Sequence, residues 1–449
     1  MSIENSVNTE VGVEGAGCEP VVPTDLPSIY ESFDEARRAS FVTAMEYKQG
    51  GGKLAGYLCS YSPLELLDAA GVAAVGLCGM NNETIPDAET VLPKNLCPLI
   101  KGTYGFALTN KCPFTYFSDM VLGETTCDGK KKMYELLADI KPVHVMQLPQ
   151  SRTRSYSGDV WYEEAKLLKA ELEERFDVEI TDEALREAVR KRNRVRRAMC
   201  SLYELQAQVP PAMSGVEMMA TLLKATFSFN VDDYAQTLED LAEARRSAYE
   251  AGERPIPPTA KRIMLTGCPT GGVIQKVGMT IERAGGVVVA LDDCSGERTQ
   301  SMLVDPDAPD ILRAISDRYL SINCSVMSPN EGRIENMMEM VKKYQVEGVV
   351  EVVLQACHTF NIESVKVAAA CEEAGVPYMK LETDYSTNDS GRSRRAWRRS
   401  SRCCRSGFRA TLRAWAMVGD VVERRFFEIA GRSRRNGLRF GCRCPRSVF

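Results

Sequence analysis

The segment KRIMLTGCPTGGVIQKVGMTIERAGGVVVALDDC, residues 261–294, contains the pattern that decides the fold. Its apolar residues predict a strand over Arg262–Thr266, a helix over Gly271–Ala284 and a second strand over Val287–Leu291. A strand, a helix of about this length and another strand form the repeating unit of a parallel sheet covered by helices. The segment therefore predicts a doubly wound α/β domain, which we place at residues 259–390.

The same alternation extends on both sides of this segment. Toward the C-terminus it predicts three helices and two more strands: Asp310–Tyr319, Gly332–Tyr344, Ile362–Ala374, Val346–Leu354 and Tyr378–Leu381. Near the N-terminus it predicts a first α/β domain over residues 46–160, with strands at Leu54–Cys59, Val72–Leu77 and Pro142–Leu148. A capping box, with Ser62 as N-cap and Glu65 closing it, is expected to begin a helix over Leu64–Ala70.

Residues 161–258 between these domains predict an inserted helical segment that ends in a Pro-rich linker. The expected helices are Glu163–Phe176, Asp182–Gln208, Val216–Phe229 and Asp233–Ala251. Thr181 is the predicted N-cap of the second helix, and its basic run Arg190–Arg197 is interpreted as a solvated face. Residues 1–45 form an acidic leader followed by a helix near Ile29–Lys48.

Charge divides the chain into two unequal parts. Residues 391–449 hold 17 Arg, no Lys and three acidic residues, a net charge of +14, whereas the rest has 39 Lys and Arg against 58 Asp and Glu, a net charge of −19. A basic arm for nucleic acid is one interpretation of this tail. Arginine without lysine, and without a helical or strand period, favours a shifted reading frame and a non-native tail. Function is therefore inferred from residues 1–390.

Composition excludes several classes of protein. The acidic body argues against a nucleic-acid partner. No apolar run reaches the ~20 residues of a membrane span. The first 24 residues lack the basic and apolar regions of a secretory signal, so we expect a cytoplasmic protein whose cysteines stay reduced.

Cysteines occur at the predicted ends of strands, where ligands bind in open α/β folds. Those that follow a strand are Cys59, Cys268, Cys294 and Cys357, while Cys97 and Cys127 have loop-like surroundings. With two histidines, His144 and His358, and no CxxC pair in the body, a zinc site is nearly excluded. Inert thiols, a redox thiol or an iron–sulfur site remain. The cysteines that best fit plain burial are Cys18, Cys78, Cys200 and Cys371, and Cys112 is left open.

Weaker motifs carry two interpretations each. The loop Gly267–Gly272 resembles a phosphate loop, but turn chemistry or support of a cluster is favoured because it matches neither nucleotide-binding pattern. The run Lys130–Lys132 is interpreted as a solvated helix start rather than a substrate contact. His358, beside Cys357, is a candidate catalytic residue that donates to a cluster sulfur or moves protons. No GxSxG elbow supports a serine hydrolase.

Several motifs together resemble the 2-hydroxyacyl-CoA dehydratase D-component family. They are GYLCSYSPLE at residues 56–65, LCP at 96–98, ETTCDGKKKMYE at 124–135 and QACH at 355–358. GCP at 267–269, DCSG at 293–296 and NCS at 323–325 resemble the double-cubane cluster proteins, a branch of that family. The resemblance covers roughly residues 45–390. One departure is Val326, where relatives of this branch tend to have a second cysteine.

The resemblance implies two Rossmann-like domains with an iron–sulfur cluster in the crevice between them. The implied cluster is either one [4Fe–4S] or a double-cubane [8Fe–9S], which needs about six cysteines. The ligands carried over are Cys59, Cys97, Cys127, Cys268, Cys324 and Cys357, with Cys294 as an alternate. The implied partners are an ATP-hydrolysing iron–sulfur activator, a second copy or a related subunit, and a small-molecule substrate.

Three functions follow as hypotheses. The first is a low-potential iron–sulfur reductase driven by the ATP-dependent activator. The second, within the same family, is a 2-hydroxyacyl-CoA dehydratase subunit that acts through a ketyl radical. The third, from a different class, is a non-catalytic electron-transfer or scaffold protein. The sequence does not identify a substrate.

Overall fold

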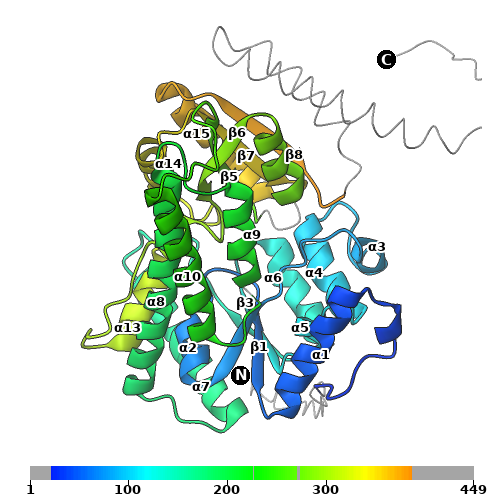
Figure 1. Cartoon of the computed structure of the whole chain (residues 1–449). Helices are drawn as coiled ribbons and strands as arrows, with labels where there is room; N and C mark the ends of the chain where they lie inside the picture. The colour runs from blue at the N-terminus through cyan, green and yellow to red at the C-terminus, as the bar shows by residue number, and fades with distance from the viewer. Residues whose placement is uncertain (1–21, 226, 270–273, 387–449) are drawn as a thin grey trace, which may run out of the picture.

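A computed structural model describes residues 22–225, 227–269 and 274–386 of the chain (Figure 1). The described residues contain two four-stranded parallel sheets. The first has the order β2-β1-β3-β4, from β1 (Lys53–Tyr57), β2 (Val72–Gly76), β3 (Met120–Glu124) and β4 (Val143–Met146). The second has the order β6-β5-β7-β8, from β5 (Lys261–Gly267), β6 (Gly286–Asp292), β7 (Gly348–Leu354) and β8 (Tyr378–Thr383). The prediction of two parallel α/β domains is confirmed.

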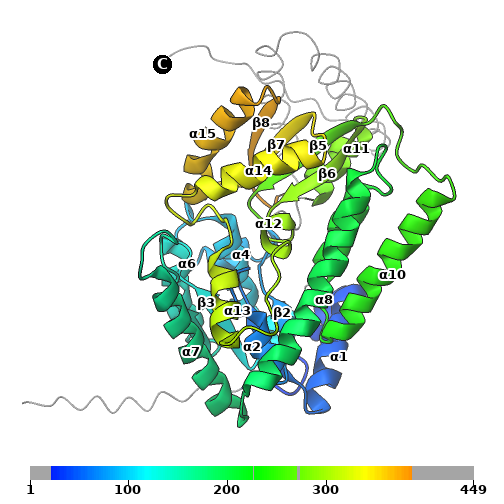
Figure 2. The ribbon, with the colours of Figure 1, turned by 90° about the vertical axis from the view of Figure 1, so that its left-hand side faces the viewer.

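Helices surround each sheet (Figures 1 and 2). Those near the first sheet are α1 (Glu35–Gln49), α2 (Leu64–Ala69), α3 (Ile85–Ala88), α4 (Pro98–Leu108), α5 (Pro113–Phe117) and α6 (Asp128–Leu137), preceded by the 3₁₀ turn η1 (Tyr30–Ser32). The predicted long helices are α7 (Ser157–Phe176), α8 (Asp182–Ala207), α9 (Gly215–Ala225) and α10 (Val231–Glu250). The later ones are the π-turn η2 (Ile274–Gly278), α11 (Met279–Arg283), α12 (Glu297–Gln300), α13 (Ile311–Leu320), α14 (Glu331–Lys343) and α15 (His358–Glu373).

The apolar core of the first sheet includes residues from the second half of the chain. Each sheet has its own cluster of buried apolar side chains, and both strands β6 and β7 are buried along their whole length. Helix α13 follows the second sheet's strand β6 in sequence, yet its residues Ile311, Ile315 and Tyr319 belong to the core of the first sheet. Figure 2 shows α13 beside α7. The two lobes therefore share packing around the crevice.

Helix α8 joins the two lobes. Thr181 accepts a hydrogen bond from the Ala184 amide, as predicted for its N-cap. The prediction of a solvated basic face is wrong for two arginines. Arg192 pairs with Asp68, and buried Arg196 pairs with Glu65 of α2 at 2.6 Å. A helix surface that packs on a neighbour can bury arginine where the partner supplies carboxylates.

The predicted capping box of α2 is also wrong. Glu65 is fully buried and accepts hydrogen bonds from Arg196 and the Tyr319 hydroxyl rather than from the Ser62 backbone. The Ser62 hydroxyl donates to Glu124 at the end of β3. The side chains of Ser62 and Glu65, which a capping box would have used, thus bind residues that are distant in sequence instead.

The remaining expectations for the ends of the chain cannot be compared with the structure. The Arg-rich tail, residues 391–449, and Cys18 in the leader lie outside the described residues. The predicted domain boundaries remain predictions. Within the described ranges, no helix has both the length and the apolar composition needed to cross a bilayer.

Candidate functional site

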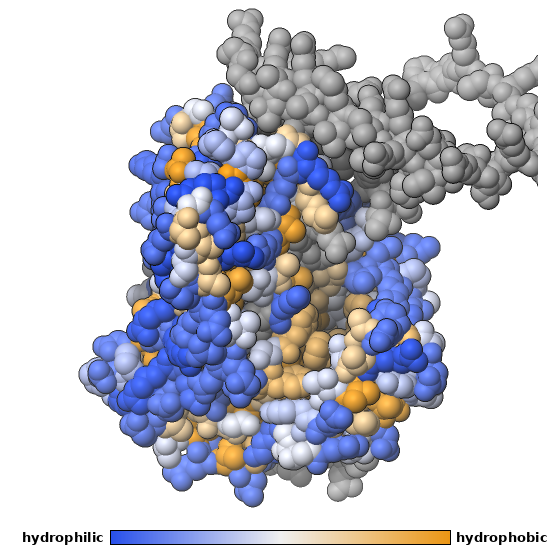
Figure 3. Space-filling view, in the orientation of Figure 1, coloured by the Kyte–Doolittle hydropathy of each residue, from blue (hydrophilic) through white to orange (hydrophobic). Residues whose placement is uncertain are grey.

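A cavity of about 1010 Å³ lies at the carboxyl ends of β1, β3, β5 and β7. In both sheets these are the two central strands, which is where open α/β sheets bind ligands. Figure 3 shows a hollow with apolar residues on the face of the molecule seen in Figure 1. The cysteines that line the cavity are Cys59, Cys78, Cys97, Cys127, Cys268, Cys294, Cys324 and Cys357.

One group of thiols, the Cys357 group, consists of Cys97, Cys268 and Cys357. The Cys268 and Cys97 thiols donate hydrogen bonds to the Cys357 sulfur, and these bonds lower the pKa of Cys357 to about 3. The Leu354 amide donates to the Cys268 sulfur at 3.5 Å. Three sulfur atoms from both lobes therefore meet at one end of the cavity.

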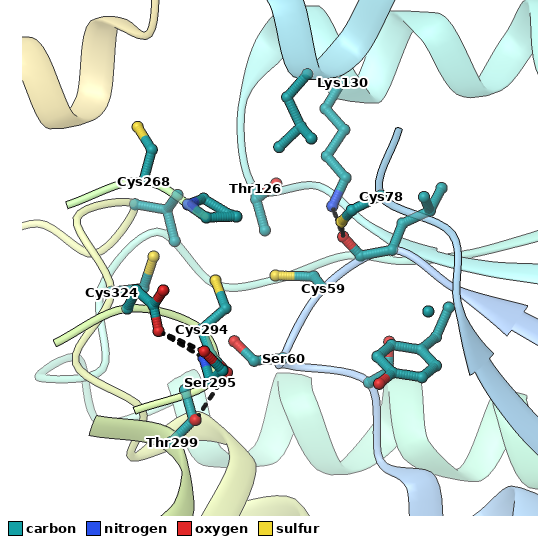
Figure 4. A pocket seen from close by; sticks show the side chains of 18 of the residues that line it. Cys59, Ser60, Cys78, Thr126, Lys130, Cys268, Cys294, Ser295, Thr299 and Cys324 are labelled. Atoms are coloured by element: carbon teal, nitrogen blue, oxygen red, sulfur yellow. Dashed lines mark hydrogen bonds between the residues drawn. The ribbon is translucent and has the colours of Figure 1, made fainter. Parts of the chain in front are cut away.

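A second group, the Cys59 group, consists of Cys59, Cys294 and Cys324. Cys59 follows β1, Cys294 follows β6 and Cys324 follows α13. Figure 4 shows the Cys59 and Cys294 side chains directed toward the same space, with Cys324 beside them. Burial raises the pKa of Cys59 to about 12, and the charges of Cys324 and Cys59 act on the neighbouring thiol of Cys294. These thiols lie close enough to interact electrostatically.

Three of the lining cysteines immediately precede helices. Cys97, Cys127 and Cys357 are the residues before α4, α6 and α15. The expectation of loop-like surroundings for Cys97 and Cys127 was incomplete, because each lies where a loop becomes a helix. Free backbone N–H groups and the helix dipole favour negative charge there.

The buried Glu124 and the partly buried Lys130 form a pair beside the Cys59 group. The Lys130 ammonium donates to the Leu58 carbonyl at 2.7 Å and lies 3.8 Å from the Glu124 carboxylate. Burial raises the pKa of Glu124 to about 7. The prediction of a solvated lysine run is thus wrong for Lys130, whereas Lys131 and Lys132 are exposed.

The other predicted candidates lie in different positions. His358 is exposed, is the first residue of α15 and lines the cavity. His144 lies on β4, where burial lowers its pKa. The loop Gly267–Gly272 is described only as far as Pro269, which also lines the cavity. Cys112, Cys200 and Cys371 are absent from the cavity lining.

The cavity's chemistry fits an iron–sulfur cluster better than a single ion. All eleven cysteines of the described residues are free thiols. Across those same residues, no three His, Cys, Asp or Glu side chains form a site for one metal ion. Two thiol groups that line one cavity instead suit a multi-iron cluster, for which thiolates are the usual ligands. The buried Tyr385 hydroxyl, which has no hydrogen-bond partner among the described residues, lies near the Cys357 group.

Sequence reasoning missed Cys78, Glu124 and Lys130 as parts of this site. The apolar pattern places Cys78 in a strand, but β2 ends at Gly76 and Cys78 lines the cavity. Its position after a strand, like that of Cys59, could have identified it. Nothing in the sequence distinguishes Lys130 from a surface cation, because its burial depends on tertiary packing.

The chain is similar to known proteins over most of its length. Residues 59–396 match the family described as 2-hydroxyglutaryl-CoA dehydratase, D-component. The chain is 46% identical over 369 residues to the Escherichia coli (strain K12) protein named "Putative dehydratase subunit YjiM", covering 82% of this chain and 96% of the relative. It is 23% identical to the beta subunit of (R)-2-hydroxyglutaryl-CoA dehydratase from Acidaminococcus fermentans, covering 83% and 97%.

A reductase is also represented among the relatives. One of the subunits of benzoyl-CoA reductase from Thauera aromatica is 23% identical over 365 residues, covering 79% of this chain and 90% of the relative. The similarity to dehydratase and reductase subunits thus extends along nearly the whole length of each relative. The chain belongs to the 2-hydroxyglutaryl-CoA dehydratase D-component family, a family of enzyme subunits.

Proposed function

We propose that this protein is a low-potential iron–sulfur reductase that receives its electrons from an ATP-hydrolysing iron–sulfur activator. The observation that carries the proposal is the presence of two three-cysteine groups on one cavity. A single [4Fe–4S] cluster uses at most four cysteines, whereas a double-cubane needs about six. The family match supports an enzyme of this chemistry.

The proposed ligands are Cys97, Cys268 and Cys357 for one half of the cluster and Cys59, Cys294 and Cys324 for the other. Cys294 replaces Cys127 in the set that the sequence favoured. The support is that Cys294 interacts with both other members of its group, whereas the first three residues already complete the Cys357 group. Cys127, whose pKa is raised by burial, lies near Cys357 as a seventh thiol outside the ligand set.

When bound, a cluster of this kind supplies low-potential electrons one at a time. The chain's own residues would exclude water and supply a proton. The cavity's apolar wall, which includes Met199, Met219 and Leu222, would exclude water from the reacting molecule. His358, exposed at the cavity and adjacent to a ligand, is the proposed proton donor.

The test is the iron and acid-labile sulfide content of anaerobically purified protein. About eight irons per chain supports the double cluster, and about four supports a dehydratase-type single cluster. The second candidate, a 2-hydroxyacyl-CoA dehydratase subunit, is favoured by the named dehydratase relatives. Turnover with an activator and ATP separates both from a scaffold, which would reduce nothing. Protein without iron would contradict both iron–sulfur functions.

A further inference from the structure

The two cysteine groups obtain their positive electrostatic potential from different parts of the protein. In the Cys357 group, the backbone N–H groups of Leu99 and Ile100 act to lower the pKa of Cys97. Its hydrogen bond to Cys357 and its burial act in the opposite direction. The Phe360 N–H acts in the same way on Cys357. These donors belong to the first turns of α4, with 11 residues, and α15, with 16 residues. This potential comes from the backbone, so side-chain substitutions leave it in place.

The Cys59 group instead has a buried side-chain cation, Arg298. Its residue is 2% exposed, and its neighbours Ser295 and Thr299 both line the cavity. Its Nη1 lies 3.4 Å from both the backbone carbonyl and the carboxylate of Asp292, and its guanidinium carbon lies 5.8 Å from the centre of the Phe360 ring. Its Nε and Nη2 atoms have no hydrogen-bond partner among the described residues. Fully buried, unpartnered guanidinium donors are rare and call for an unseen acceptor.

Arg298 follows Cys294 by four residues, at the start of α12, and interacts electrostatically with thiols of the Cys59 group. After Asp292, Cys324 and Cys294 are the groups whose negative charge most raises the pKa of Arg298. Two nearby carboxylates offset part of the positive charge of Arg298. Asp292 also pairs with Arg333, and Asp293 accepts hydrogen bonds from the Ser295 amide and hydroxyl. Arg298 nevertheless acts more strongly on the Cys294 thiol than Asp293 does.

Lys130 approaches the same group from the first lobe. It binds the Leu58 carbonyl, directly before Cys59, and lies on the far side of Cys59 from Cys294 and Cys324 (Figure 4). Burial raises the pKa of the Cys59 thiol, and the charge of Lys130 is the strongest influence that lowers it. Glu124, 3.8 Å away, offsets part of it, so Lys130 should contribute less than Arg298.

We propose that Arg298, assisted by Lys130, sets the reduction potential of the cluster half held by the Cys59 group and leaves the other half unaffected. The proposal rests on the proposed function. An all-thiolate cluster becomes more negative on reduction, so a fixed buried cation stabilises its reduced form more than its oxidised form. Donors to ligand or cluster sulfur act in the same direction. Arg298 is thus a tuning residue, not a ligand.

The experiment compares full-length wild-type protein with Arg298→Met and Arg298→Lys. Iron and sulfide are counted first, and each sample is then titrated against potential by electron paramagnetic resonance. We expect full iron in each. In Arg298→Met, the ratio of reduced to oxidised cluster at a fixed potential should fall at least about tenfold for one signal only, which is about 59 mV for one electron. Arg298→Lys should restore most of the shift.

The matched control is Arg313→Met, which removes an exposed α13 arginine paired with Asp159 and Asp317. It should leave both signals unchanged. For the second cation, Lys130→Met should shift the same signal as Arg298→Met by a smaller factor, while Lys132→Met, on the exposed side of α6, should shift neither.

Three results would overturn the proposal. One is an unchanged ratio in Arg298→Met with full iron, and another is an equal shift of both signals. The third is loss of iron in Arg298→Met, Arg298→Lys and Lys130→Met alike, which would make these residues structural. Wild-type protein without iron, or with about four irons, would instead contradict the proposed function.

Discussion

The two lobes have the same strand order but contribute unequally to the site. The first lobe supplies one cysteine to each group, Cys97 and Cys59, and the chain after residue 259 supplies two to each. Neither lobe alone holds a complete group. Equal topology therefore does not give equal chemistry, because the residues after each strand, rather than the sheet itself, determine what the crevice can bind.

The interior of the second lobe contains a buried ionic network beside its sheet. The network is centred on Arg333, whose Nε donates to Asp292 at 3.1 Å and whose Nη2 donates to Thr266 at 2.8 Å. Arg333 also pairs with Glu351 and Glu363, so it joins β5, β6, β7 and α15. In the second lobe this network ties together β5, β6 and β7, the strands that precede Cys268, Cys294 and Cys357. Such a network is stable only when all its partners are present.

The largest expected effect comes from removing one cysteine of either group. Cys59→Ala and Cys357→Ala should each lose about half of the bound iron, because one half of the cluster then keeps only two of its three proposed thiolate ligands. Cys97→Ala should resemble Cys357→Ala. Anaerobic iron and sulfide analysis measures this, with Cys371→Ala, a thiol buried within α15, as the control that retains iron. Full iron content in all three variants would contradict the assignment of these cysteines as cluster ligands.

The next effect tests the ionic network of the second lobe. Arg333→Met should lower the free energy of unfolding by about 3–5 kcal/mol, because Glu351 and Glu363 lose their buried counter-ion. The exposed control Arg313→Met should cost less than about 1 kcal/mol. Urea denaturation of both variants gives the values. Equal costs would mean that the second lobe does not depend on its network.

A third test uses the pair described beside β3, Glu124 with Lys130. The pKa of Glu124 is raised by burial from 4.5 to about 7, so the folded protein binds a proton that the unfolded chain has released. The contribution of Glu124 to the free energy of unfolding is therefore full below pH 4.5. As the pH rises to about 7, this contribution is lost, and the free energy of unfolding falls by up to about 3 kcal/mol. Unfolding of cluster-free protein measures the slope.

In Glu124→Gln this decline between pH 4.5 and 7 should disappear, whereas the exposed control Glu135→Gln should keep it. The comparison is made across pH within each variant, so an overall change in stability does not affect it. A Glu124→Gln protein with the wild-type slope would show that Glu124 is ionised throughout.

The smallest effect concerns the strand end before Cys268. Gly267 has a φ of +121°, and a Cβ there would lie 2.1 Å from the Val352 carbonyl oxygen of β7. Gly267→Ala should cost about 2 kcal/mol and shift Cys268. Gly375→Ala, at a φ of +68° with open space, should cost about 1 kcal/mol. Thermal unfolding compares them, and a Gly267→Ala protein no less stable than Gly375→Ala would contradict the close approach of β5 and β7.

Much of the fold could be predicted from the sequence because apolar periods mark most of its strands and helices. Strand β3 was missed since Met120–Glu124 is short and carries no turn residues that set it apart. The positions of Cys59, Cys268, Cys294 and Cys357 after strands were predictable for the same reason as the strands.

Grouping those cysteines was not predictable from the sequence. It depends on how the lobes face each other, and this in turn depends on α13, which packs on the core of the other lobe. The roles of Glu65, Lys130 and Arg196 were also hidden, because a polar residue near a helix end fits a local motif or a solvated face equally well until its tertiary partner is known.

Helix α8 sets a limit on how this chain can change length. Arg196 fixes the helix to α2 of one lobe, and ten residues later the Gln206 carbonyl accepts a hydrogen bond from Arg262 of the other. One inserted residue would rotate the second anchor by about 100° and advance it by about 1.5 Å. Single-residue insertions or deletions between the two anchors would therefore shear the lobes past one another, and only changes close to whole helical turns would keep both anchors in phase.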